Sequence, residues 1–342
     1  MANDSLSDGC NLTSWDALVG YDLEFAVYHV FVFIYLTVGL GGNIILLAAF
    51  WEQSKKERAY RYQVIFTVSK TLEIFWFGTF LLAYYWLGSS FIGVDWFTKC
   101  FFLMYIFKDL GFGMHYTFMI TSLLLAIAMA ADRVFAIMKP LVYNKIKKCR
   151  HQYLAACICL AFGLLGSALY FYSMKIHWDG TRYVAELDEE LYHSSVGYML
   201  FFIGVTMRLG GLAILLMLYL VMVIAFRMHM RRVNSILRIS RKNQEDSNRS
   251  AEKTLLWLNI YQALMMLFNQ LPHVIWHFLY YLMPFSYHYC FGRIIGAVCD
   301  ATVLITDTLD FFIVIAINKR MKSLVLNAMP GPLNRQATVS EK

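Results

Sequence analysis

The stretch AMAADRVFAIMKPLVYNKIKKCR, residues 128–150, joins the end of an apolar run to a strongly basic segment. Asp132 and Arg133 stand side by side where the character of the chain changes. An apolar helix followed by basic residues is typical of a span that leaves a membrane on its cytoplasmic side. The stretch therefore raises two questions: how many such spans the chain has, and what the acid–base pair does at the end of this one.

The chain as a whole is too apolar for a soluble protein. It has 342 residues, of which 59% are hydrophobic and only 15% are charged, whereas soluble domains carry about 25% charged residues. The first apolar run begins near Phe25 and is too long for the core of a signal peptide, so we interpret it as a spanning helix. We expect an all-α membrane protein.

Seven segments are long and apolar enough to cross a bilayer, which takes about 20 residues of helix. They cover residues 25–50, 63–87, 101–134, 152–174, 196–228, 254–282 and 291–317. This pattern predicts a seven-transmembrane helix bundle over 25–317, preceded by an N-terminal segment over 1–24 and followed by a tail over 318–342. The start of the tail alternates basic and apolar residues, which predicts a short amphipathic helix lying on the membrane.

Basic residues set the expected orientation. Residues 51–62, 132–152, 227–253 and the tail from 318 together hold 23 of the 30 Lys and Arg residues. By the positive-inside rule these segments are cytoplasmic, so we expect an extracellular N-terminus at the plasma membrane. Asn11 begins an Asn-Leu-Thr sequon and is then a candidate for glycosylation. The net charge of +7 follows from this topology and requires no nucleic-acid partner.

With seven spans and this acid–base pair, the chain resembles a rhodopsin-like (class A) G-protein-coupled receptor. Glu252 precedes Pro272 by 20 residues, which is the family spacing between an inner acid and a kinked helix. The resemblance implies a latch in which Arg133 is held by Asp132 and Glu252 at rest and is released to Tyr219 when a ligand binds. The alternative is a charge pair at a helix end and a solvated acid favoured by the helix dipole.

A second set of matching positions lies deeper in the spans. Asn43, Glu73, Ser122 and Asp310 map onto the family's buried sodium-and-water cluster. Carboxylates inside a membrane are expensive and are functional candidates by default, and two close carboxylates must share a proton or a cation. Alternatively, the two acids are protonated and hydrogen-bond to each other. No metal other than sodium and no cofactor is expected.

The match to the family is incomplete. The seventh span lacks the family's proline and tyrosine, Gln270 stands where many members have tryptophan, and Gly211 replaces a proline. The outer loop 175–195 has no cysteine, so the usual disulfide of the family cannot form. Three cysteines in or near outer segments permit one other pair: Cys10, Cys100 and Cys290. The chain is similar to divergent invertebrate, notably nematode, receptors for peptides or chemosensory molecules.

The resemblance also suggests where a ligand binds. His115 stands where amine receptors carry an aspartate, and no lysine for a retinal Schiff base occurs in 291–317. Family geometry directs five polar residues toward the ligand pocket: His115, Arg208, Gln270, His273 and Asp300. The acidic outer stretch ELDEE either attracts a basic ligand or is only a solvated loop. A basic or amidated neuropeptide is the first expectation and a small chemosensory molecule the second.

Other classes fit less well. A transporter would show internal repeats and broken helices, but no repeat is visible and Pro272 is the one proline deep in a span. No HExxH or GxSxG motif indicates an enzyme. A decoy receptor that binds without signalling remains an alternative because of the changes in the seventh span. The expected partners are an extracellular ligand, a heterotrimeric G protein and membrane lipid.

Overall fold

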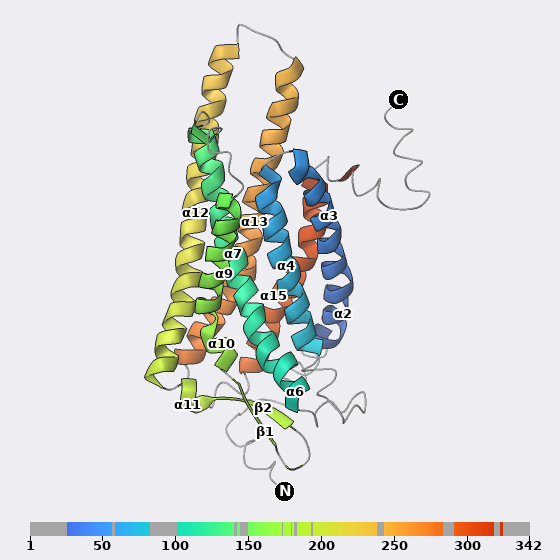
Figure 1. Ribbon diagram of the computed structural model, residues 1–342, viewed down its shortest axis with the longest axis vertical. Coiled ribbons are helices and arrows are strands. Elements are labelled where there is room, and N and C mark those ends of the chain that lie inside the picture. The colour runs from blue at the N-terminus through green and yellow to red at the C-terminus, as the bar shows by residue number, and fades with distance from the viewer. Residues whose placement is uncertain are drawn as a thin grey trace, which may run out of the picture.

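A computed structural model describes most of the membrane-spanning chain. The described residues are 26–56, 59–82, 101–139, 142–143, 150–172, 174–178, 180, 183–192, 194–237, 243–282, 291–317 and 322–323. Within them the protein is an elongated bundle of helices with a small hairpin at one end (Figure 1). The predicted all-α membrane bundle is thereby confirmed for this part of the chain.

The first span is one continuous helical rod with two wide turns. It consists of η2 (Ala26–Phe31), α2 (Val32–Ile34), η3 (Tyr35–Gly39) and α3 (Leu40–Lys56). The pieces η2 and η3 are π-helical, a form that often marks functional positions in longer helices. Here η3 presents the buried Tyr35 to the interior.

The remaining spans follow the predicted order. They are α4 (Ala59–Leu81), then α6 (Phe101–Met104), η6 (Tyr105–Leu110) and α7 (Gly111–Met138), then α9 (Arg150–Gly166) and α10 (Ala168–Tyr172), then α12 (Ser195–Leu237), α13 (Asn243–Leu282) and α15 (Phe291–Ile317). The third, fifth and sixth helices are longer than the apolar segments that predicted them. Because helix continues into the basic segment 227–253 from both sides, α12 and α13 project beyond the other helices (Figure 1).

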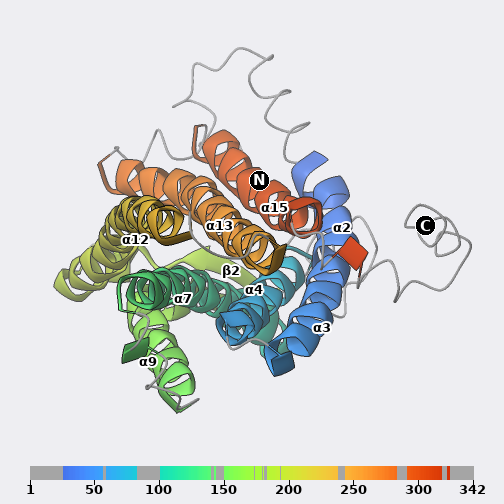
Figure 2. The ribbon, with the colours of Figure 1, turned by 90° about the horizontal axis from the view of Figure 1, so that it is seen from above.

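The helix α7 lies at the centre of the packing. It contacts α4, α9 and α12, while α3 packs on α4 and α13 packs on α15. The view along the bundle shows these helices grouped around α7 and α4 (Figure 2). Large apolar side chains such as Phe33, Met217 and Phe268 point outward, as expected where a helix faces lipid.

Four helices of the described chain are long and apolar enough to cross a membrane by length and composition alone. They are Ala26–Lys55, Tyr60–Leu81, Gly111–Met138 and Ser195–His229, and His151–Gly166 is a shorter apolar helix. The two remaining long helices are α13 and α15, and α15 carries aspartates at positions 300, 307 and 310. Both α13 and α15 complete the bundle by packing against each other.

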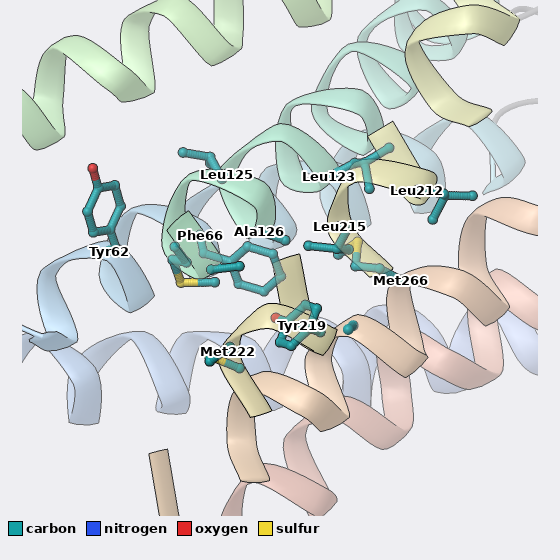
Figure 3. Packing of buried hydrophobic residues seen from close by; sticks show 13 residues of the cluster. Tyr62, Phe66, Leu123, Leu125, Ala126, Leu212, Leu215, Tyr219, Met222 and Met266 are labelled. Carbon is teal, nitrogen blue, oxygen red and sulfur yellow. The ribbon is translucent and has the colours of Figure 1, made fainter. Parts of the chain in front are cut away.

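The main hydrophobic core joins α4, α7, α12 and α13. Figure 3 shows it from close by, with Tyr219 and Met222 of α12 beside Phe66 of α4 and Met266 of α13. The core cluster comprises Tyr62, Phe66, Leu123, Leu125, Ala126, Met129, Ala130, Leu212, Leu215, Tyr219, Met222, Ala263 and Met266. Gly211 lets α12 approach α7, because an added Cβ would lie 2.9 Å from a methyl group of Leu123.

The outer loop contains a hairpin that the sequence analysis did not predict. Strand β1 (Met174–Trp178) pairs antiparallel with β2 (Tyr183–Leu187), so that Lys175 lies opposite Glu186. Gly180 in the connection has φ of 99°, which only glycine adopts without strain. The short helix α11 (Glu189–Tyr192) follows, and the backbone N–H of Leu191 donates to Asp188.

Some predicted features fall outside the described residues. These are Asn11, the three candidate disulfide cysteines Cys10, Cys100 and Cys290, and nearly all of the predicted amphipathic helix in the tail. Of that helix, only Lys322 and Ser323 are described, and both are helical and exposed.

Candidate functional site

A buried ion triad joins the second and seventh helices. The ammonium Nζ of Lys70 lies 3.0 Å from Oε1 of Glu73 and 2.9 Å from Oδ1 of Asp307. Lys70 and Glu73 face the same way because they are three residues apart on α4. The exposed fractions of the three side chains are only 6%, 0% and 4% in the order Lys70, Glu73, Asp307.

Neutral donors complete the hydrogen bonding of the two acids. The hydroxyl of Ser122 on α7 donates to Oε2 of Glu73 at 3.2 Å. The hydroxyl of Tyr35 donates to Oδ2 of Asp307 at 3.1 Å, and Nδ2 of Asn269 on α13 donates to Oδ1 of the same acid at 3.1 Å. The triad therefore ties together five helical segments of the bundle: η3, α4, α7, α13 and α15.

Charge balance explains why these donors are needed. One ammonium faces two carboxylates, so the site carries excess negative charge whenever both acids are ionised. A buried charge is tolerated only when it is paired and hydrogen-bonded. Lys70 supplies the pairing, and Tyr35, Ser122 and Asn269 supply the hydrogen bonds.

The structure changes the membership of the predicted sodium-like cluster. It brings Glu73 and Ser122 together, but the amide of Asn43 donates to the carbonyl of Gly39 in its own helix at 2.9 Å. Asp310 lies about one turn beyond Asp307 on α15 and within electrostatic reach of Lys70, yet makes no hydrogen bond or ion pair to another described residue.

Sequence reasoning missed Lys70 and Asp307. Both are charged residues inside apolar segments, a signal that by default marks a functional site. The spacing of Lys70 and Glu73 was a second signal, because oppositely charged residues three apart on a helix are neighbours. The cation that two close acids require is thus a side chain of the protein itself. Among the described residues, no group of three or more His, Cys, Asp or Glu could hold a metal ion.

The predicted latch is described in part. Asp132 and Arg133 lie near the end of α7, both half-buried. The carboxylate of Asp132 accepts a hydrogen bond from the hydroxyl of Tyr143 at 2.8 Å. Glu252 lies on α13, but its side chain is outside the described residues. The pairing of Arg133 with Glu252 stays a prediction.

Tyr219, the predicted acceptor of the freed arginine, lies in the hydrophobic core (Figure 3). Its side chain is buried, and its hydroxyl has no hydrogen-bond partner among the described residues. Leaving a buried hydroxyl unpaired costs about 1–3 kcal/mol. Tyr219 therefore has an unused hydrogen-bonding capacity in this conformation.

Arg208, one of the predicted ligand-pocket residues, is buried against aromatic rings. The rings of Tyr116 and Tyr170 stack with centroids 3.8 Å apart. The guanidinium carbon of Arg208 lies 4.5 Å from the centroid of Tyr116 and 5.2 Å from that of Tyr170. Its exposed fraction is 1%, and Nε and Nη2 lack hydrogen-bond partners among the described residues.

The other predicted pocket residues are also buried or half-buried. His115 stacks on Phe77 at 4.1 Å between ring centroids. Nε2 of His273 lies 3.7 Å from Oδ1 of Asp300, and the hydroxyl of Tyr28 donates to Oδ2 of that acid at 2.8 Å. Gln270 donates to the carbonyl of Met119 at 3.2 Å. Hereafter the polar cluster means His115, Arg208, Gln270, His273 and Asp300.

Parts of the polar cluster interact. His115 and Arg208 both contact the ring of Tyr116, at 5.0 Å between ring centroids and at 4.5 Å from the guanidinium carbon. His273 also contacts Tyr116 edge to face, with ring centroids 6.2 Å apart. Besides Arg208, His115 and Gln270 have unused polar atoms, since both ring nitrogens of His115 and Oε1 of Gln270 lack hydrogen-bond partners among the described residues.

A multi-pass helical bundle with charged groups buried between its helices is the architecture of an integral membrane protein. The family model described as 7 transmembrane receptor (rhodopsin family) matches residues 42–313. The chain therefore belongs to the rhodopsin family of seven-transmembrane receptors, which confirms the resemblance seen in the sequence. A comparison with curated proteins finds none that matches.

Family membership sets the general role of the chain. It is a multi-pass membrane receptor of the class that responds to extracellular ligands and acts on G proteins. Members of this family are generally not enzymes.

Proposed function

We propose that the protein is a plasma-membrane receptor, with its N-terminus outside, that activates a heterotrimeric G protein when a peptide ligand binds the polar cluster. The concentration of Lys and Arg in four segments supports this orientation, since those segments hold 23 of 30. The basic extensions of α12 and α13 then border the G-protein site.

The observation that carries the signalling proposal is the unpaired hydroxyl of Tyr219. A buried donor without a partner is stabilised when a second conformation supplies one. In our proposal Arg133 supplies it after leaving Asp132 and Glu252. Pro272 lies inside α13 and removes a backbone hydrogen bond, so the inner part of α13 can swing away and release Arg133.

The hairpin neutralises part of the acidic loop that was expected to attract a basic ligand. Lys175 pairs with Asp188 at 2.9 Å and with Glu190 at 3.1 Å, so part of the acidic loop is neutralised within the hairpin. The attraction for a basic ligand is correspondingly reduced. A peptide remains the proposed ligand.

A small chemosensory molecule is the second candidate. It is favoured by the deep burial of the polar cluster, where His115 is 0% and Arg208 1% exposed. A compact ligand fits among such residues with less rearrangement than a long peptide. The two candidates differ in size, so one screen with both kinds of compound separates them.

The test is a cellular assay of G-protein activation against a peptide library and a library of small polar molecules. We expect a peptide to activate the wild-type receptor and Arg133→Ala to abolish that response at equal surface expression. Lys55→Ala, which changes an exposed cation paired with Glu52, is the control and should respond normally. Ligand-dependent signalling that survives Arg133→Ala would rule out the latch.

A second arm addresses the resting state. Glu252→Ala should raise basal signalling, because Arg133 loses a charged partner. Basal signalling that is unchanged or lower at equal surface expression contradicts this role of Glu252.

A further inference from the structure

Arg208 is a buried cation that has no counter-ion among the described residues. Its exposed fraction is 1%, and it forms no ion pair with any described residue. An unpaired charge removed from water is among the most costly features a protein can contain. The conformation described here therefore lacks one component that would make this arrangement stable, namely a negative charge.

The neighbouring aromatic rings do not supply that component. Tyr116 and Tyr170 attract the guanidinium through their π faces. A ring face opposes the flat side of the guanidinium and leaves the N–H groups at its edge unpaired. The rings therefore fix the orientation of Arg208 without satisfying its donors.

The unpaired atoms form a specific edge. Nε and Nη2 both lack hydrogen-bond partners within the part of the chain that the structure describes, and these two nitrogens lie next to each other with their N–H bonds roughly parallel. A carboxylate places its two oxygens at the matching separation and accepts from both donors. The fork geometry thus selects a planar anion with two oxygens over a single-point acceptor.

The acid of the polar cluster is engaged elsewhere. Asp300 accepts from Tyr28 at 2.8 Å and lies 3.7 Å from His273. His115 lies next to Tyr116, the ring that Arg208 faces, with ring centroids 5.0 Å apart, and its two ring nitrogens have no hydrogen-bond partner among the described residues. One of these nitrogens carries a hydrogen and can donate a further hydrogen bond to an anion bound there.

We propose that Arg208 binds a carboxylate group of the ligand through Nε and Nη2, with His115 as an additional donor. This inference rests on the proposed function, because it names the chemical group that the receptor recognises. The carboxylate comes either from the free C-terminus of a peptide or from a small organic acid.

The test uses the purified full-length receptor and measures its thermal midpoint with matched pairs of probes. One set pairs acetate, benzoate, phenylacetate and succinate with the corresponding amides. The other pairs peptides that have a free C-terminal carboxylate with the same peptides amidated. We expect carboxylates, and not amides, to raise the midpoint, because binding to the folded state stabilises it. A response only to peptide acids identifies the C-terminus as the source, and a response to small acids identifies an organic acid.

Three variants test the role of Arg208. Arg208→Gln should abolish the carboxylate effect while leaving the ligand-free midpoint equal to or above that of the wild type, because it removes an unpaired buried charge. Arg208→Lys keeps the charge without the fork and should weaken carboxylate binding by about tenfold or more. Lys175→Gln removes an exposed cation of the hairpin and should leave binding unchanged.

Three results overturn the proposal. They are an equal effect of acids and amides on the wild type, no effect of any acid, and a ligand-free midpoint that falls in Arg208→Gln. The last result would show that contacts within the protein already stabilise the charge of Arg208. Activation by an amidated peptide that depends on Arg133 but not on Arg208 would leave the proposed function intact and exclude this inference alone.

Discussion

Nζ of Lys70 lies 2.9 Å from Oδ1 of Asp307, across 237 residues of sequence. This contact connects α4 to α15 in the interior of the bundle, where both side chains are almost inaccessible to solvent. With Glu73 it forms the ion triad, which occupies the place where the family resemblance led us to expect a sodium ion.

Lys70→Met should destabilise the receptor strongly. The substitution leaves Glu73 and Asp307 buried without their cation, and removing one partner of a buried pair costs about 3–5 kcal/mol. Thermal unfolding of the purified protein measures this loss. Lys55→Met, at an exposed pair with Glu52, should cost at most about 1 kcal/mol.

Neutralising the acids should restore part of the loss. We expect the triple variant Lys70→Met, Glu73→Gln, Asp307→Asn to be more stable than Lys70→Met alone, because no uncompensated charge remains. Equal stabilities of these two variants would show that Lys70 acts through packing and not through charge.

The wild-type receptor should not depend on sodium. Replacing sodium in the buffer with a large organic cation is expected to leave the thermal midpoint unchanged, because the ammonium of Lys70 already contacts both acids. In Lys70→Met the midpoint should gain sodium dependence. A wild-type midpoint that drops on sodium removal contradicts this prediction.

Tyr219→Phe should separate stability from signalling. The substitution removes a buried hydroxyl that has no partner among the described residues, so thermal stability should stay equal or rise. Agonist-driven G-protein activation should fall, because Arg133 loses its proposed partner. Tyr35→Phe is the control with the opposite stability effect: it removes a hydrogen bond to Asp307 and should cost about 1 kcal/mol.

Gly163→Ala should loosen the packing of α9 on α7. An added Cβ would lie 2.8 Å from the backbone carbonyl oxygen of Thr117, which cannot move without shifting the helix. Such overpacking costs about 1–3 kcal/mol. Gly210→Ala is the matched control, because nothing lies within 4 Å of the added atom and alanine is the better helix former by about 1 kcal/mol. A melting temperature of Gly163→Ala equal to or above that of the wild type would count against this close approach of α9 to α7.

The hairpin should lose order in acid. The hydrogen bond from Lys175 holds the pKa of Asp188 below its ordinary value of 3.8, and hydrogen bonds to Asp188 and Glu190 raise the pKa of Lys175 above 10.5. The stabilisation that Asp188 gives to the hairpin is therefore present above pH 3.8 and is lost as the pH falls through the lowered pKa of Asp188. The contribution of Lys175 is present below pH 10.5 and lost as pH rises through its raised pKa.

Hydrogen exchange of the backbone N–H of Leu191, which donates to Asp188, reports on this order. After correction for intrinsic rates, protection should be constant from about pH 5 to pH 8 and fall in stronger acid. Asp188→Asn should lower protection at neutral pH, whereas Glu190→Gln, whose side chain is 91% exposed, should change it little. Equal effects of the two substitutions would contradict the role of Asp188.

The sequence predicted the number and order of the helices because each span is a long apolar run between basic or polar segments. It did not predict the hairpin, because the acidic residues of the loop were interpreted as a source of negative charge and not as part of two paired strands. Asp179-Gly180 was the available signal, because Asp-Gly is a favoured turn between strands. Helix ends were less certain, because α12 and α13 continue through basic sequence.

The sequence predicted some residues of the candidate site and missed others, and the reason is geometric. Asp307 and Asp310 are three residues apart on α15, so they lie on similar faces of the helix, and only the relative height of α4 and α15 decides which one Lys70 contacts. Sequence does not give that height. Family geometry directed Arg208 toward the ligand pocket, but its burial and its lack of a partner among the described residues depend on every neighbouring side chain and required the structure.

One turn of α13 touches both acids of α15 that carry hydrogen bonds. Asn269 donates to Asp307 at 3.1 Å, and His273 lies 3.7 Å from Asp300. These two residues flank Pro272, where the backbone can bend at low cost. A bend of α13 at Pro272 would therefore alter the spacing between the two contacts. If a ligand bound at the polar cluster moves His273, the same bend would reach Asn269 one turn away, and the change would enter the interior of the bundle near its centre.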